Sequence, residues 1–163
     1  EIELFRNSLA EDLHIAADHA DNFAETIDKI STDKEVIELK PEVITTKAHD
    51  ALNDNADHFV MRLVKVEVKP EDAEKFAHEV KKEMTTSMAA EPGMEIMMSG
   101  VNKKNENEWY FVEVYFDDKA YDAHIKSPQY VEYIENTDGM VARRDVKDLV
   151  RDTLATQGAI VLD

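Results

Sequence analysis

The 163-residue sequence contains no cysteine, and this absence removes several kinds of chemistry. Without thiols there can be no disulfide, no thiolate nucleophile and no cysteine-ligated metal site. Only 4 glycines occur, and no glycine-rich phosphate loop is formed from them. No apolar run approaches the roughly 18 residues that span a bilayer, and the acidic start Glu1-Ile2-Glu3 shows no signal peptide. Together these absences predict a cytoplasmic protein.

Positive charge is also scarce. The chain has 19 Lys and Arg against 36 Asp and Glu, which gives a formal net charge of −17. Such a chain repels nucleic acid and anionic membrane surfaces, so neither is expected as a partner. A metal site is not expected either, because there is no His-Glu-x-x-His run and because His14 and His19 are five residues apart, which does not stack them on one helical face.

The hydrophobic pattern of residues 58–163 predicts one complete α+β module. Strands are indicated at 59–68, 94–101, 109–116 and 159–162 by β-branched, aromatic and apolar runs. Helices are indicated after Pro70, over 119–126, after Pro128, and around Val146–Leu154. The order β-α-β-β-α-β is the ferredoxin-like pattern, an antiparallel sheet with helices on one face.

The beginning of the chain resembles the back half of this module at an offset of 110 residues. Ile2-Glu3-Leu4-Phe5 aligns with Val112-Glu113-Val114-Tyr115, and His14-Ile15 aligns with His124-Ile125. Residues 1–40 are therefore interpreted as a strand-helix-strand partial repeat, 41–57 as a linker, and 1–57 together as a truncated first module. Chance similarity between acidic helices is the alternative. The missing initiator Met leads us to expect native sequence upstream.

Three motifs in residues 59–135 resemble the antibiotic biosynthesis monooxygenase family. They are Glu91-Pro92-Gly93-Met94 before a strand, Val112-Glu113-Val114-Tyr115 within the next strand, and the run from Asp122 to Pro128 after it. The resemblance implies a dimeric α+β barrel, formed by a homodimer or by an intrachain pseudo-dimer. It also implies a cleft between sheet and helices for a small aromatic molecule, without a cofactor. Haem is disfavoured, because the His and Asn of the haem-degrading relatives have no counterparts here.

Six residues are candidates for the site. His124 interrupts an apolar helical face, Glu113 an aromatic strand face, and Arg62 a valine face, and these three are the catalytic candidates. A neutral histidine could accept a substrate proton, and an arginine could hold a phenolate. Met98, Trp109 and Tyr115 are the candidates for lining an apolar substrate pocket. Each has a structural alternative: a packed histidine, an Arg62–Glu113 ion pair, or ordinary core.

The function predicted from these residues is that of a cofactor-independent monooxygenase acting on a quinol-like or phenolic small molecule. Removal of a phenolic proton makes the ring electron-rich enough to pass an electron to oxygen. Two alternatives remain open at this point. One is an isomerase of a small hydroxyketone that uses the same histidine and acid, and the other is a non-catalytic module for ligand binding or assembly. Fold alone does not choose among them.

Overall fold

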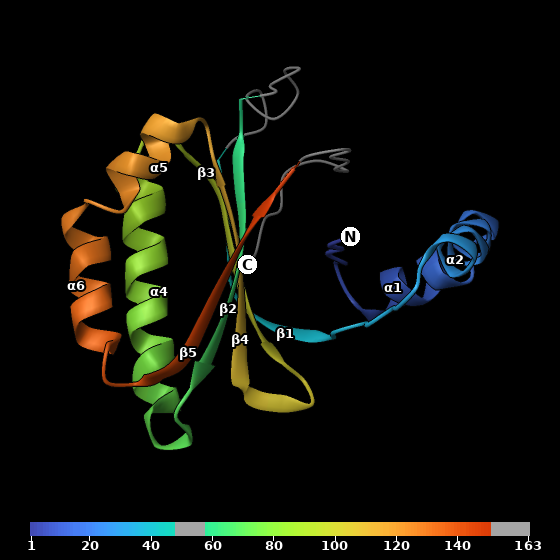
Figure 1. Ribbon diagram of the computed structural model, residues 1–163, viewed down its shortest axis with the longest axis horizontal. Helices are drawn as coiled ribbons and strands as arrows, with labels where there is room; N and C mark the ends of the chain where they lie inside the picture. Colours follow the sequence, from blue (N-terminus) through green and yellow to red (C-terminus); the bar gives the residue numbers. More distant parts are fainter. Residues whose placement is uncertain (48–57, 151–163) are drawn as a thin grey trace. The chain divides into compact units, whose positions relative to one another are not determined.

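The computed structural model describes residues 1–47 and 58–150, which fall into two compact units, Glu1–Val36 and Ile37–Asp163. The two units are described separately. The first contains two helices, α1 (Ser8–Ile15) and α2 (Asp18–Ile30), shown in blue in Figure 1. None of the helices in the described ranges has the length and apolarity needed to cross a membrane.

The second unit is a five-stranded antiparallel sheet with helices on one face. Its strands are β1 (Leu39–Thr46), β2 (Val60–Val68), β3 (Met94–Asn102), β4 (Asn105–Tyr115) and β5 (Val141–Leu149), in the order β1-β3-β4-β2-β5. A short 3-10 helix, η1 (Pro70–Asp72), leads into α4 (Ala73–Ala90), and α5 (Asp118–His124) and α6 (Pro128–Thr137) follow β4. Figure 1 shows these three α-helices on the same side of the sheet. The predicted ferredoxin-like α+β fold is confirmed.

Local sequence signals account for where the helices begin. Pro70 and Pro128 occupy the first turns of η1 and α6, where a missing N–H costs nothing. The Asp117 carboxylate accepts a hydrogen bond from the Ala120 amide at 2.8 Å, and the Ser127 hydroxyl accepts one from the Tyr130 amide at 3.3 Å. These side chains satisfy amides at the helix starts that have no partner within the helix.

The core lies between the helices and one face of the sheet. Alternate residues of β2 and β4 point to that face, and it meets the apolar stripe of α4 formed by Phe76, Val80 and Met84. The Phe76 ring is fully buried and packs edge-on against the Trp109 ring at a centroid distance of 5.2 Å. Aromatic pairs in this geometry add to the stabilisation from buried area. The packing fixes α4 against this face of the sheet.

One part of the secondary-structure prediction for the second unit is wrong, and another is not tested. Residues 141–149 form strand β5, which pairs with β2, where we expected a helix around Val146–Leu154. Ladder hydrogen bonds to a neighbouring strand outweigh a short helical spacing of apolar residues. The predicted strand at 159–162 lies outside the described residues. Strand β5 therefore takes the last place in the predicted β-α-β-β-α-β order.

The N-terminal prediction also needs correction. Residues 2–5 form no strand, and a strand without a neighbour within its own unit is not expected to be stable. The next strand is β1, at Leu39–Thr46, which lies largely in the segment interpreted as a linker and pairs with β3 at the edge of the sheet. The observed order is helix-helix-strand, so the predicted strand-helix-strand repeat is not confirmed in that form.

A glycine sets how closely α5 approaches the start of β3. A Cβ atom added to Gly93 would lie 2.4 Å from the Cβ of Ala120, whereas one added to Gly139 would have no heavy atom within 4 Å. We predict that Gly93→Ala lowers the free energy of unfolding by about 1–3 kcal/mol, because the backbone must shift to relieve the overlap. Gly139→Ala is the matched control and should change stability by about 0.5 kcal/mol or less. Urea unfolding of both variants tests this, and equal stabilities would contradict the packing described.

Candidate functional site

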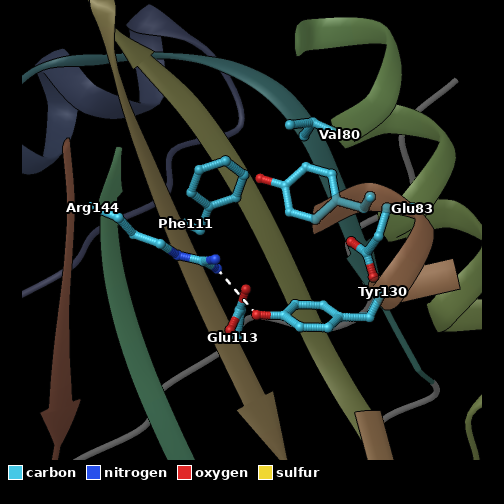
Figure 2. A pocket seen from close by; sticks show the side chains of 7 residues that line it. Val80, Glu83, Phe111, Glu113, Tyr130 and Arg144 are labelled. Carbon is cyan, nitrogen blue, oxygen red and sulfur yellow. Dashed lines mark hydrogen bonds between the residues drawn. The ribbon is translucent and has the colours of Figure 1, made fainter. Parts of the chain in front are cut away.

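A small cavity of about 10 Å³, roughly the space of one water molecule, lies between the sheet and the helices of the second unit. We call it the helix–sheet cavity and define it by its lining residues, which come from α4 (Val80, Glu83), β4 (Phe111, Glu113), α6 (Tyr130, Tyr133) and β5 (Arg144). Figure 2 shows Arg144 and Tyr130 pointing toward each other beside Glu113. Apolar walls with a few convergent polar groups are the usual composition of a small-molecule site.

Arg144 reaches the cavity from the last strand of the sheet. It pairs in register with Val66, so its side chain points to the helix-covered face. The residue as a whole is exposed, and its guanidinium donates a hydrogen bond to the Tyr130 hydroxyl at 3.3 Å. A guanidinium that hydrogen bonds to a neutral phenol keeps its positive charge available for an anionic ligand.

Glu83 is a carboxyl group buried in the wall of the cavity. It is 5% exposed, and the Ser87 hydroxyl one helical turn away donates a hydrogen bond to it at 2.7 Å. Burial raises the pKa of Glu83 from its usual 4.5 to about 7, although the hydrogen bond from Ser87 and the positive charge of His124 act in the opposite direction. Near neutral pH this carboxyl can therefore either accept or release a proton.

His124 lies directly behind Glu83 at the end of α5. It is 1% exposed, its Nδ1 lies 3.1 and 3.2 Å from the two carboxylate oxygens of Glu91, and its Nε2 is 4.0 Å from Oε1 of Glu83. Burial alone would lower the pKa of His124. The hydrogen bond to Glu91 and the surrounding negative charges outweigh burial and raise it. The protonated imidazolium is thus favoured more strongly than in a free histidine.

Glu91 keeps this imidazolium in place. It caps the C-terminal end of α4, and its carboxylate accepts a hydrogen bond from the Gln129 side chain at 2.6 Å. Burial would raise the pKa of Glu91, but the hydrogen bonds and the positive charge of His124 lower it overall. The Lys47 ammonium donates a hydrogen bond to the Glu91 backbone carbonyl, which ties the end of β1 to the same point.

The sequence-predicted catalytic residues are only partly brought together. Glu113 lines the cavity, as expected. His124 is adjacent to Glu83 but does not line the cavity. Arg62 lies opposite Glu113 in the strand register, as predicted, but its guanidinium pairs with Asp148 and lies 4.0 Å from the centre of the Tyr121 ring. The arginine that lines the cavity is Arg144.

The predicted substrate-binding residues are more dispersed. Tyr115 is fully buried and donates a hydrogen bond to Glu113 at 2.9 Å, and burial raises its pKa so that it stays neutral. Trp109 is buried in the core against Phe76 and does not line the cavity. Met98 pairs with Val112, one residue out of step with the Met97–Glu113 pair, so it lies on the opposite face of the sheet.

Six residues that line the cavity were not among the sequence candidates: Val80, Glu83, Phe111, Tyr130, Tyr133 and Arg144. Arg144 lies just before the segment that was expected to be helical, so its side chain could not be assigned to a sheet face. Glu83 had a usable signal, because it follows Phe76 and Val80 at helical spacing and so falls on the apolar face of α4. A carboxylate on such a face is almost never buried without a partner or a role.

Comparison with known proteins gives a consistent result. The sequence pattern of the antibiotic biosynthesis monooxygenase family matches residues 59–136. A crystal structure of a "putative monooxygenase" from Lactobacillus acidophilus NCFM is 71% identical, with a TM-score of 0.87; the match covers 98% of this chain and 72% of that one. No match was found among curated proteins.

Two more distant structures share the fold. A "putative monooxygenase" from Fusobacterium nucleatum is 23% identical with a TM-score of 0.87, over 96% of this chain and 70% of that one. A "putative antibiotic biosynthesis monooxygenase" from Bacteroides thetaiotaomicron is 27% identical with a TM-score of 0.57, and the match covers 66% of this chain and 100% of that one. Residues 59–136 carry the sequence pattern of the antibiotic biosynthesis monooxygenase family, and at 71% identity over nearly its whole length this chain belongs to the same family as the "putative monooxygenase" of Lactobacillus acidophilus.

Proposed function

We propose that the chain is a monooxygenase that acts on a small phenolic or quinol-like molecule without a bound cofactor, with Glu83 as the base. One observation carries this proposal. The buried carboxyl of Glu83, with a pKa of about 7, lines the same cavity as Arg144, whose guanidinium donates a hydrogen bond to the Tyr130 hydroxyl. A base that titrates near the working pH combines a useful ionised fraction with a useful proton affinity. The arginine can bind the anion that results.

The walls of the cavity favour a compact aromatic substrate. The cavity volume of about 10 Å³ has room for roughly one water molecule, so the lining side chains must move apart to admit a ring. Val80 and Phe111 supply apolar contacts for a ring, while Glu83 and Arg144 supply the polar ends. A one- or two-ring phenol could place its hydroxyl near the carboxylate and its developing negative charge near the guanidinium.

The proposed reaction begins with transfer of the phenolic proton to Glu83. The phenolate then passes an electron to dioxygen, and the two radicals combine to form a carbon–oxygen bond. Loss of water from the peroxide leaves a quinone. One oxygen atom of dioxygen enters the product and the other leaves as water, while the substrate loses two hydrogens, so atoms and electrons balance. The side chains of the cavity would bind and orient the substrate and remove the proton.

His124 takes a supporting role in this scheme. Because its pKa is raised, His124 is protonated to a greater extent than a free histidine at the same pH, which makes it less available as a proton acceptor. Its Nε2, 4.0 Å from Glu83, instead stabilises the ionised form of that carboxyl. We therefore propose His124 as a positioning residue that tunes Glu83, rather than as the base expected from the sequence. Glu113, held by the Tyr115 hydroxyl, would keep Arg144 and Tyr130 oriented.

The alternatives are separated by the fate of oxygen. With 1-naphthol as probe and dioxygen labelled with the heavy oxygen isotope, a monooxygenase gives 1,4-naphthoquinone that carries one labelled atom. An isomerase of a hydroxyketone consumes no oxygen. A ligand-binding or assembly module binds phenols without turnover. Mass spectrometry of the product, together with an oxygen electrode, decides among the three, and a screen of small phenols that gives binding but no labelled product would rule out the oxygenase.

Replacing the proposed base should reduce turnover strongly. We predict that Glu83→Gln lowers kcat by about 100-fold or more, because general-base catalysis contributes that much. In the unmodified protein the rate should rise as the pH passes through about 7, and this rise should be missing from the residual rate of the variant. Glu74→Gln, an exposed change on the same helix, is the matched control and should keep the wild-type rate and pH profile. A pH profile that is unchanged in Glu83→Gln would exclude Glu83 as the base.

The same carboxyl should make stability depend on pH. The folded-state pKa of Glu83 is raised above its unfolded value, so its stabilising contribution is full below 4.5 and is lost as the pH rises through about 7. The pKa of His124 is also raised, so its contribution is lost in the same direction. We predict a free energy of unfolding that falls as the pH rises from about 4.5 to about 7, with a smaller fall in Glu83→Gln. Urea titrations at several pH values measure it, and equal slopes in the two proteins would contradict the burial of an ionisable Glu83.

The two arginines can be told apart by ligand binding. We predict that Arg144→Met weakens binding of 4-nitrophenolate about 10-fold or more, since a charge-assisted hydrogen bond is worth roughly 1.5–3 kcal/mol. Arg62→Met should leave the affinity unchanged, because Arg62 pairs with Asp148 away from the cavity. The visible absorbance of the bound phenolate reports both affinity and ionisation. Loss of binding in Arg62→Met, with Arg144→Met unaffected, would restore the assignment made from the sequence.

A further inference from the structure

The first unit repeats a local structure found beside the helix–sheet cavity, at an offset of 110 residues. The Asn7 side chain accepts a hydrogen bond from the Ala10 amide at 2.9 Å, and the Asp117 side chain accepts one from the Ala120 amide at 2.8 Å. The backbone angles of the two capping residues agree closely, with φ and ψ of −165° and 174° in one and −161° and 178° in the other. Helices α1 and α5 therefore start in the same way at the same offset.

The agreement extends to side chains on either side of these caps. The rings of Phe5 and His14 lie 5.3 Å apart with a tilt of 45°, and those of Tyr115 and His124 lie 5.3 Å apart with a tilt of 50°. The next helices also begin at this offset, α2 at Asp18 and α6 at Pro128. Sequence similarity between two acidic helices does not by itself bring the counterpart rings together, so the ring contact is an additional observation in three dimensions.

The two copies differ in how far their equivalent side chains are exposed to solvent. His14 has 34% of its side chain exposed, whereas the His124 side chain is 1% exposed. Phe23 is 47% exposed, whereas its counterpart Tyr133 is 7% exposed and lies in the core beside Phe76 of α4. The described part of the first unit contains no counterpart of the long helix α4. Its histidine and its apolar helix face are therefore uncovered where those of the second unit are covered.

We propose that residues 1–30 form the rear half of a second site of the same kind, with His14 in the place of His124. The occupant that completes this half-site is a strand and long helix of the kind found at Val60–Ala90. That segment would lay an apolar helix face over Phe23 and bring a carboxylate to His14, as α4 brings Glu83 to His124. The ligand class of the second site rests on the proposed function of the first.

The chemistry of the half-site is consistent with this role. Nε2 of His14 lies 3.1 Å from a carboxylate oxygen of Glu3, and Glu3 is the counterpart of Glu113, which lines the first cavity. On its other side, Nδ1 of His14 lies 3.4 Å from Nε2 of His19, so at least one of these rings must supply an unprotonated nitrogen. The ring of His14 is thus accessible and already lies beside Glu3, the counterpart of Glu113. A counterpart of Glu83 would come from the completing segment.

The test supplies the missing segment while keeping the full chain. Because residue 111 is the counterpart of residue 1, a second copy of residues 59–110 is joined directly before Glu1. Reaction of His14 with diethyl pyrocarbonate is followed by mass spectrometry, and binding of 4-nitrophenol by titration. We expect modification of His14 to slow by at least about tenfold in the extended chain, as for a group that becomes buried. The stoichiometry of 4-nitrophenol should rise from one to two per chain.

A matched variant shows whether the new site depends on the proposed contact. Phe23→Asp in the extended chain places a charge on the face that the added helix should cover, so His14 should become reactive again and the stoichiometry should return to one. Equal reactivity of His14 in the extended and unextended chains would overturn the proposal. If neither chain binds 4-nitrophenol but His14 is still protected, the proposed function fails and the repeated half-site stands.

A measurement on the unextended chain tests the proposal even if the extended chain does not fold. Proton NMR should show a nuclear Overhauser effect between the rings of Phe5 and His14, matching one between Tyr115 and His124. An absent Phe5–His14 contact, with the Tyr115–His124 contact present, would remove the structural equivalence and with it the second site.

Discussion

The arrangement of the second unit depends on one interaction, the approach of the buried Glu83 carboxyl to the His124 imidazole at 4.0 Å. Both groups are removed from water, and burying a charge is costly unless it is paired and hydrogen-bonded. Ser87 and Glu91 provide those partners at 2.7 Å and 3.1 Å. Ser87 belongs to helix α4 and Glu91 is its C-terminal cap. The position of this one helix therefore determines the ionisation of both Glu83 and His124.

This interaction links the fold to the chemistry through the antiparallel register. The Gly93–Ala120 approach sets α5, which carries His124, close to the start of β3. The pairing of β5 with β2 brings Arg144 to the same face as Glu113. Glu83, the proposed base, and Arg144, the cation that lines the same cavity, therefore come from segments about sixty residues apart in the chain. Neither end of the site could form without the pairing of these strands in one sheet, which explains how a small ferredoxin-like unit brings Glu83 and Arg144 to one cavity.

The sequence was sufficient for those features that depend on local rules. The helices predicted over 119–126 and after Pro128 begin behind the capping residues Asp117 and Ser127, and Arg62 lies opposite Glu113 as the ferredoxin-like strand order implied. The sequence was insufficient where a segment far away in the chain determines the partner of a side chain. Asp148 of β5 takes up the Arg62 guanidinium, which the sequence could not show while that segment was expected to be helical. Met98 was placed on the wrong face because strand periodicity alone does not say which face the helices cover. His124 was singled out from the sequence as a base, but its protonation depends on Glu83 and Glu91, both far away in sequence.

The central claim is that Glu83 is a carboxyl that gains and loses its proton near neutral pH inside the helix–sheet cavity. The most direct measurement is a carbon-13 NMR titration of the side-chain carboxyl groups, with the Glu83 signal assigned by its disappearance in Glu83→Gln. A chemical-shift transition near pH 7 is the predicted result. A Glu83 signal that titrates near 4.5, as an exposed glutamate does, would contradict the account.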